Sequence, residues 1–197
     1  MARYPLSKEL KQAISRLSDK EKDKLLFRLI PKNPDLVRKL TFELLEDGET
    51  AEVRREKIRE LVENHAEVCI ANYYSPGYVL MDLRTISGII NQHVKTTKDK
   101  YGEIELNLYM LTEVISSLVK EIEAAPRDKV RTLSQYVAKR THKLNQLLKK
   151  QHEDVLLDFR EDWIHLGNLI DYVPAFKISA VVVGVDVEAV REGELYE

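Results

Sequence analysis

The sequence predicts an all-α protein, a helical bundle of long antiparallel helices with an N-terminal αα-hairpin and a C-terminal apolar segment. Charged residues make up 32% of the 197 residues, with only 7 Gly and 6 Pro, a composition typical of long helices with one solvated face. Hydrophobic residues make up 44%, which is enough to form a core. The clearest helical period lies mid-chain, at Ile104, Leu108, Leu111, Ile115, Leu118 and Ile122.

Residues 1–48 are expected to form an N-terminal helical cap that packs on the bundle. Ser7 can cap a first helix, Ser18 begins a second with a capping-box sequence, and Asn33-Pro34 begins a third. The third helix should end at Asp47-Gly48. Because only a short turn separates the last two helices, they should form the αα-hairpin.

Residues 49–173 should form the bundle. Three helices are expected over residues 50–125, with breaks at Ser75-Pro76-Gly77 and at Tyr101-Gly102. The second helix contains Gly88, which costs about 1 kcal/mol relative to Ala unless close packing offsets it. The first should bury an apolar stripe made of Ile58, Leu61, Val62, His65, Val68, Cys69 and Asn72.

A fourth helix is expected over residues 127–150, followed by a bend near residues 151–154 and a helix that ends before Pro174. Residues 174–197 then form an apolar segment with an acidic tail. Within it, residues 178–185 are β-branched and almost uninterrupted, which favours a strand over the alternative of a short buried helix. A strand would need an edge to pair with, in this chain or in another copy, so a homo-oligomer through this segment is one expectation.

The net charge of −2 hides two opposed blocks. Residues 127–150 carry eight Lys/Arg and one acidic residue, whereas residues 151–197 carry three Lys/Arg and eleven acidic residues. Either the acidic block offsets the basic helix within the fold, or the basic helix faces an anionic partner. The candidate face for such a partner is Arg127, Lys129, Arg131, Lys139, Arg140 and Lys143. A nucleic acid bound there would show strongly salt-dependent affinity.

Three tyrosines surround the first predicted turn of the bundle. Tyr73, Tyr74 and Tyr78 flank Ser75-Pro76-Gly77. Exposed tyrosines are frequent anchors of protein interfaces, although tyrosines also close helix ends against a core. The turn is therefore a candidate protein interface.

The residues that could carry chemistry form no recognisable catalytic or metal constellation. His65 and Cys69 have a metal-chelating spacing, but both lie on the predicted apolar stripe. His93 on the next helix is offset from His65 by about six residues, or about 9 Å along the helix axis. Asp162 precedes His165 by three residues, but a di-iron bundle needs two such pairs and two further glutamates. The His152-Glu153-Asp154 run has no nucleophile or phosphate loop nearby. The sequence therefore predicts no catalytic, cofactor or metal site.

A single cysteine excludes an internal disulfide framework. The first residues contain no apolar run typical of a signal peptide, and no stretch of about 18 apolar residues is present. We therefore expect a cytoplasmic protein that does not enter a membrane.

Three short segments carry a resemblance to a known family. They are Leu6-Ser7-Lys8-Glu9-Leu10, Leu17-Ser18-Asp19-Lys20-Glu21, and residues 76–109 with Met81-Asp82-Leu83 and Tyr101-Gly102-Glu103-Ile104. Their order is similar to that of an uncharacterised all-helical bacterial family, of the domain-of-unknown-function type. The resemblance implies a helical fold and a bacterial cytosol, and it implies no activity.

Three functions follow from these patterns. The leading one is a non-enzymatic helical interaction or adaptor protein whose partner is another protein. The alternative is a nucleic-acid-binding protein that uses residues 127–150. The third, a metal-dependent helical-bundle enzyme, rests on His65, His93 and His165.

Overall fold

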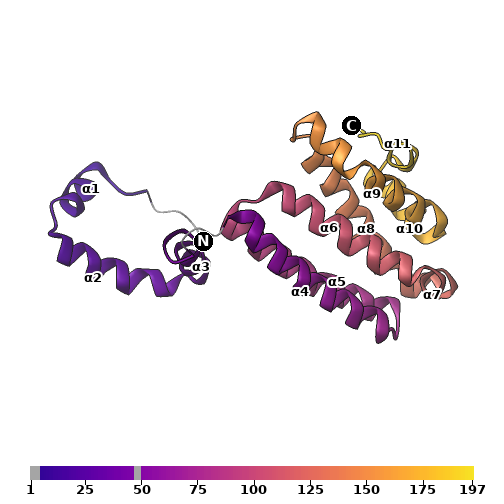
Figure 1. The fold of residues 1–197 in the computed structure, drawn as a ribbon, viewed down its shortest axis with the longest axis horizontal. Helices are drawn as coiled ribbons and strands as arrows, with labels where there is room; N and C mark the ends of the chain where they lie inside the picture. Colours follow the sequence, from indigo (N-terminus) through magenta and orange to yellow (C-terminus); the bar gives the residue numbers. More distant parts are fainter. Residues whose placement is uncertain (1–4, 47–49) are drawn as a thin grey trace. The chain divides into compact units, whose positions relative to one another are not determined.

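The computed structural model describes residues 5–46 and 50–197, and within them the protein is all-α, with eleven α-helices, one short 3₁₀ turn and no strand (Figure 1). The predicted fold class is confirmed. The chain divides into two compact units, Met1–Gly48 and Glu49–Glu197. Each is described by itself below.

The first unit contains three α-helices and a 3₁₀ turn: α1 (Lys8–Ser15), α2 (Asp19–Leu29), η1 (Ile30–Lys32) and α3 (Pro34–Leu44). The predicted helix starts are confirmed. The Ser7 hydroxyl accepts from the Leu10 amide, Ser18 forms its capping box, and the Asn33 side chain accepts from the Leu36 amide. The predicted end at Asp47-Gly48 lies outside the described residues. None of the described residues of this unit is buried.

The second unit is a helical bundle around one central helix. Its helices are α4 (Ala51–Ala71), α5 (Pro76–Thr97), α6 (Lys100–Ser117), α7 (Val119–Ala124), α8 (Arg127–Leu148), α9 (Glu153–Tyr172), α10 (Pro174–Val183) and α11 (Val187–Glu192). Helix α6 contacts α4, α5, α8 and α9, and most of its residues are buried. Helix α10 packs mainly on α8, and α11 packs on α9 (Figure 1). Residues 174–197 are thus part of the bundle core, which includes Phe176, Val187 and Val190.

The predicted strand over residues 178–185 is wrong. Residues 178–183 belong to helix α10, which begins with Pro174 in its first turn and ends at Val183, followed by Gly184 in the left-handed conformation, φ 81°. A proline at the start and a glycine just past the end are favourable helix boundaries. Packing of Phe176, Ser179 and Ala180 overrides the β propensity of the valines.

The predicted break at Tyr101-Gly102 is also wrong. Helix α5 ends at Thr97, its C-cap Lys98 has a left-handed φ of 64°, and Asp99 caps α6 by accepting a hydrogen bond from the Gly102 amide at 2.8 Å. Gly102 serves close packing instead, because a Cβ there would collide with the side chains of Asp99 and Arg55. The following helix, predicted as continuous, is interrupted at Leu118 between α6 and α7.

Across the described ranges, no single helix is long and apolar enough to cross a membrane, while α9 and α10, bent by 110°, pass that test only as a pair.

Candidate functional site

A groove lies between α8 and α10 and is called the α8–α10 groove below. It contains two adjoining pockets. The first, of about 240 Å³, is lined by Arg127, Asp128, Arg131, Ser134, Ala175, Ile178 and Ser179. The second, of about 370 Å³, is lined by Arg131, Gln135, Lys139, Ile178, Ser179, Val182 and Val183. Residue numbers rise along the groove on both helices, so α8 and α10 run in the same direction.

One wall of the groove is apolar and open to solvent. Ile178 and Val182, which line the pockets, are 58% and 80% exposed, and the neighbouring Val181 on α10 is 70% exposed. Single exposed apolar residues are normal on protein surfaces, but a contiguous group beside a hollow is typical of a binding surface. Phe176 and Ala180 are buried on the opposite side of α10, and Ser179, also buried, lies at the floor of the groove.

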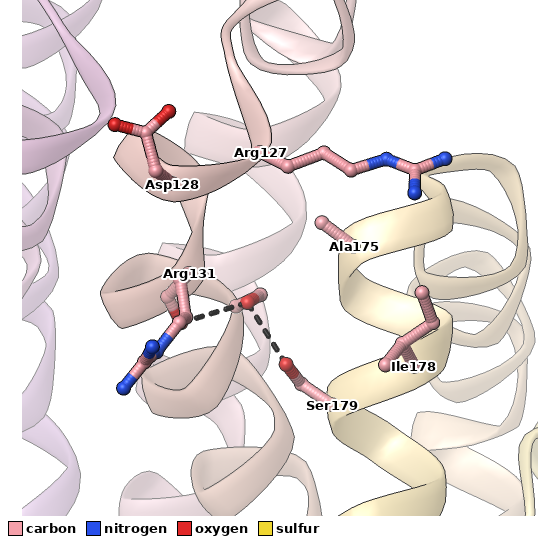
Figure 2. Close-up of a pocket in the computed structure, with 7 residues that line it drawn as sticks. Arg127, Asp128, Arg131, Ala175, Ile178 and Ser179 are labelled. Atoms are coloured by element: carbon pink, nitrogen blue, oxygen red, sulfur yellow. Dashed lines mark hydrogen bonds between the residues drawn. The ribbon is translucent and has the colours of Figure 1, made fainter.

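The floor of the first pocket is a short hydrogen-bonded chain (Figure 2). The Ser179 hydroxyl donates to the Ser134 hydroxyl at 2.9 Å, and the Ser134 hydroxyl donates to the Arg131 carbonyl at 2.8 Å. Each serine has a single proton, and both protons are used. The floor can therefore accept a hydrogen bond but cannot donate one.

The other wall is a basic row on α8, formed by Arg127, Arg131 and Lys139. All three side chains are exposed, and within the described residues none of them forms an ion pair. They are spaced 4 and 8 residues apart, so the row extends for about 18 Å along α8 and turns by about 120° around its axis from Arg127 to Lys139. Figure 2 shows Arg127 reaching across to the beginning of α10, whereas Asp128 points to the opposite side.

The other three residues of the predicted basic face lie elsewhere. Lys143 forms an ion pair with the buried carboxylate of Glu103 on α6 at 2.7 Å. Arg140 donates to the Asn107 side chain at 3.2 Å and lies over the ring of Tyr136. Lys129 lines a separate pocket beside the tyrosine turn. The predicted face is therefore divided among the groove, the bundle interior and the tyrosine pocket.

The acidic block after residue 150 forms no ion pair with α8 among the described residues. The two segments are joined through the backbone instead. The fully buried Asn145 side chain accepts from the Tyr196 amide at 3.2 Å and donates to its carbonyl at 2.8 Å, and Lys149 donates to the same carbonyl. The charges of Arg127, Arg131 and Lys139 are therefore left for solvent or a partner.

The predicted tyrosine turn forms a second hollow on the surface. Tyr74 and Tyr78 are exposed, and their rings meet edge-to-face with centroids 5.1 Å apart. Tyr73 is half-buried, and its hydroxyl donates to the Glu121 carbonyl at 3.4 Å. A pocket of about 500 Å³ is lined by Tyr73, Tyr74, Ser75, Pro76, Ala125, Pro126 and Lys129.

A buried polar network surrounds the start of α6. His93 Nε2 lies 3.1 Å from the Asp99 carboxylate, and Arg55 forms ion pairs with Asp99 and Glu105, each at 3.2 Å. Burial acts to raise the pKa of the Asp99 carboxyl, but hydrogen bonds from His93 and the Gly102 amide, with Arg55, outweigh it and hold the pKa below its ordinary value. The network fastens α6 to α4 and α5.

Glu103, one turn into α6, is held in a similar way. Burial acts to raise the pKa of its carboxyl, but hydrogen bonds from Lys100 and Lys143 lower it overall. Since Lys143 belongs to α8, this ion pair joins α8 to α6.

The remaining candidates for chemistry do not come together. Cys69 is buried, and burial, together with Asp82, raises the pKa of its thiol to about 12, so little reactive thiolate is present. His65 is exposed and bonded to the Leu61 carbonyl. His152 caps α9 and lies 3.1 Å from Asp154, both in solvent. In the described part of the chain, no three His, Cys, Asp or Glu residues are grouped as a metal site would require.

Sequence reasoning missed the apolar wall of the groove. The β propensity of residues 178–185 predicts a strand, and a strand does not separate exposed Ile178 and Val182 from buried Ala180. The signal that could have found it is the pair Pro174 and Gly184, which marks a ten-residue helix. The rotation of α8 that selects its outward residues depends on Glu103 and Asn107 of α6, which no local pattern indicates.

Comparisons of the chain with protein-family models, with curated proteins and with solved structures found no match. The similarity of residues 6–10, 17–21 and 76–109 to a helical bacterial family therefore stays a prediction.

Proposed function

We propose that this is a non-enzymatic interaction protein, which holds a partner protein in the α8–α10 groove. The observation that carries the proposal is the combination of Ile178, Val181 and Val182 in solvent with the unpaired basic row on α8. Apolar side chains at the centre with charges at the edge are the usual anatomy of a protein-binding surface. A cytoplasmic location is part of the same proposal.

Nucleic-acid binding is the second candidate, because Arg127, Arg131 and Lys139 form no ion pair among the described residues. Two features favour a protein instead. Non-specific nucleic-acid sites combine a basic groove with aromatic rings on which bases stack. Here the wall opposite the row is aliphatic, and the α8 aromatic side chain, Tyr136, is turned inward, where its hydroxyl donates to the Leu83 carbonyl at 3.2 Å.

The test is affinity purification of the full chain from its own cells, followed by mass spectrometry, with three forms compared. They are the wild type, the double variant Ile178→Gln/Val182→Gln, and the control Met81→Gln, which changes an equally exposed apolar residue on α5. Gln keeps a good helix propensity, so all three should fold equally well. Proteins retained by the wild type and the control but lost from the double variant support the proposal.

The proposal is overturned if the double variant retains the same proteins as the wild type. It is also overturned if the wild type retains only nucleic acid, with affinity that falls steeply as salt is raised.

A further inference from the structure

Resting on the proposed function, we infer that the partner enters the α8–α10 groove as an amphipathic helix, with carboxylates spaced to match Arg127, Arg131 and Lys139. The inference adds the chemistry of the partner and its register to the location of the site. It follows from the shape of the groove, the spacing of the row and the hydrogen bonds of the floor.

The shape of the groove favours a helix. Its two pockets adjoin along the axis of α8, and Ile178 lines both of them. A helix that lies in a groove places side chains into successive pockets at positions i, i+3 or i+4, and i+7. The pockets, of about 240 and 370 Å³, are large enough for aliphatic side chains from two successive turns. A flat lipid surface would leave both pockets unfilled.

The spacing of the basic row sets the charges of the partner. Residues four apart on a helix are about 6 Å apart along its axis, and residues twelve apart are about 18 Å apart. A partner helix aligned with α8 therefore has carboxylates at the same heights as Arg127, Arg131 and Lys139 when its acidic residues are at i, i+4 and i+12, and the long arginine and lysine side chains bridge the turn of about 120° between the first and last positions. Its apolar residues then face Ile178 and Val182.

The hydrogen bonds at the floor of the first pocket favour this partner over an anionic small molecule. Both serine protons are used within the chain from Ser179 through Ser134 to the Arg131 carbonyl. A phosphate or carboxylate placed deep in the pocket would find only acceptors there. The deep position therefore disfavours an anionic group, while a carboxylate is bound at the rim by the arginines, which have free donors.

A second copy of this chain fits less well. In a two-fold dimer through this surface the two basic rows would oppose each other, and Asp128 is the only acidic residue of the block 127–150. The exposed acidic side of α9, with Asp154, Asp158 and Asp162, has Leu157 as its exposed large apolar residue. One such side chain cannot fill both pockets.

The experiment is a selection from a displayed library of 18-residue helical peptides on the full-length wild type. Binding of the enriched peptides is then measured by fluorescence anisotropy. We expect the enriched sequences to combine an apolar stripe with Asp or Glu at i, i+4 and i+12. Arg131→Glu should weaken their binding about tenfold or more, whereas Arg84→Glu, an exposed charge reversal on α5, should not.

A charge exchange makes the register itself testable. A peptide whose acidic residue opposite Lys139 is changed to Lys should lose affinity for the wild type and regain it with Lys139→Glu. Enriched peptides without carboxylates, binding unaffected by Arg131→Glu, or no enrichment at all would overturn the inference. So would groove-dependent binding of anionic lipid vesicles or single-stranded RNA, or a mass in solution that falls from dimer to monomer with Arg131→Glu.

The two failures are distinguishable. If Ile178→Gln/Val182→Gln loses the partner proteins but the selection gives no acidic helix, the partner chemistry is wrong and the interaction function stands. If the double variant keeps every partner protein, the groove is not the binding surface and both proposals fall.

Discussion

The Ser179 hydroxyl on α10 donates a hydrogen bond to the Ser134 hydroxyl on α8, with the two oxygens 2.9 Å apart and both side chains buried. This bond joins the two helices that form the groove. It is the first of two successive hydrogen bonds, because the Ser134 hydroxyl in turn donates to the Arg131 carbonyl. The two serines therefore differ in their hydrogen bonds: Ser179 only donates, whereas Ser134 both accepts and donates.

Removing each hydroxyl should have a different cost. Ser134→Ala leaves the Ser179 proton without its acceptor in a buried position, which costs about 1–3 kcal/mol of unfolding free energy. Ser179→Ala leaves only a lone pair unused and should cost about 1 kcal/mol or less. Urea unfolding of both variants measures the difference. Equal losses would show that the direction of the bond is not as described.

Two glycines should respond in opposite directions to Ala. A Cβ on Gly167 of α9 would lie 2.8 Å from the Arg191 nitrogen and 2.9 Å from the Val190 carbonyl carbon, so α11 would have to move. Gly88 of α5 has open space around its Cβ position, so close packing does not offset its cost. We expect Gly167→Ala to lower the unfolding free energy by about 1–3 kcal/mol and Gly88→Ala to raise it by about 0.5–1 kcal/mol.

Thermal unfolding of the two glycine variants is the measurement. A stabilised Gly167→Ala would contradict the close packing of α11 on α9. A destabilised Gly88→Ala would contradict the open position on α5.

The carboxyls of Asp99 and Glu103 should make the fold sensitive to acid. Their pKa values in the folded state are lowered below the ordinary 3.8 and 4.5, so the unfolded chain takes up protons first as the pH falls. Their contribution to stability is present above about pH 5 and is lost as the pH falls through the folded pKa values. We expect the melting temperature to decrease steeply below about pH 5.

Glu103→Gln tests this origin. It should melt at a lower temperature than the wild type at neutral pH, because Lys143 loses its buried partner, and its acid dependence should be shallower. The control Glu161→Gln removes an exposed carboxylate of α9 and should leave the melting temperature at neutral pH and its acid dependence unchanged. A Glu103→Gln curve parallel to that of the wild type would contradict the lowered pKa.

Trp163, the only tryptophan, reports the docking of the C-terminal residues. It is fully buried, and its indole nitrogen donates to the Glu194 carbonyl at 3.0 Å. Deleting residues 193–197 removes this acceptor and the Tyr196 contacts with Asn145. We expect a red-shifted tryptophan emission and a lower melting temperature. Unchanged emission would mean that the last residues do not cover the ring.

The helix starts could be predicted because the signals are local. Ser18, Asn33 and Asp99 each accept bonds from amides within three residues, and Pro76 and Pro174 restrict their own backbone. Two starts differ from the prediction: α6 begins at Lys100, two residues before Gly102 of the predicted break, and α10 begins at Pro174, where an extended segment is expected. The sequence does not show that Gly102 is needed for the approach of Arg55 from α4.

The predictions fail where contacts between helices, and not the local sequence, determine which side of a helix is buried. The predicted stripe of α4 included Leu61, His65 and Val68, all of which are exposed, whereas Val62 and Ala66 are buried. The α4 sequence has apolar residues on more than one side, and its contacts with α5 and α6 select the inner one.

The basic helix was recognised from composition alone, and three of its six predicted residues line the groove. The other three could not be told apart by sequence. Lys143 and Arg140 are turned toward Glu103 and Asn107, residues 40 and 33 positions earlier in the chain. The apolar wall on α10 was missed because its valines resemble a strand until the helix boundaries are recognised.

Hydrogen exchange of the full chain, alone and in complex with the partner protein retained in the affinity purification, tests the central claim most directly. We expect binding to slow amide exchange in residues 127–139 of α8 and 175–183 of α10, because the partner covers both walls of the groove. Protection confined to other surfaces, such as the turn at Tyr73–Tyr78, with α8 and α10 unchanged, would contradict the account.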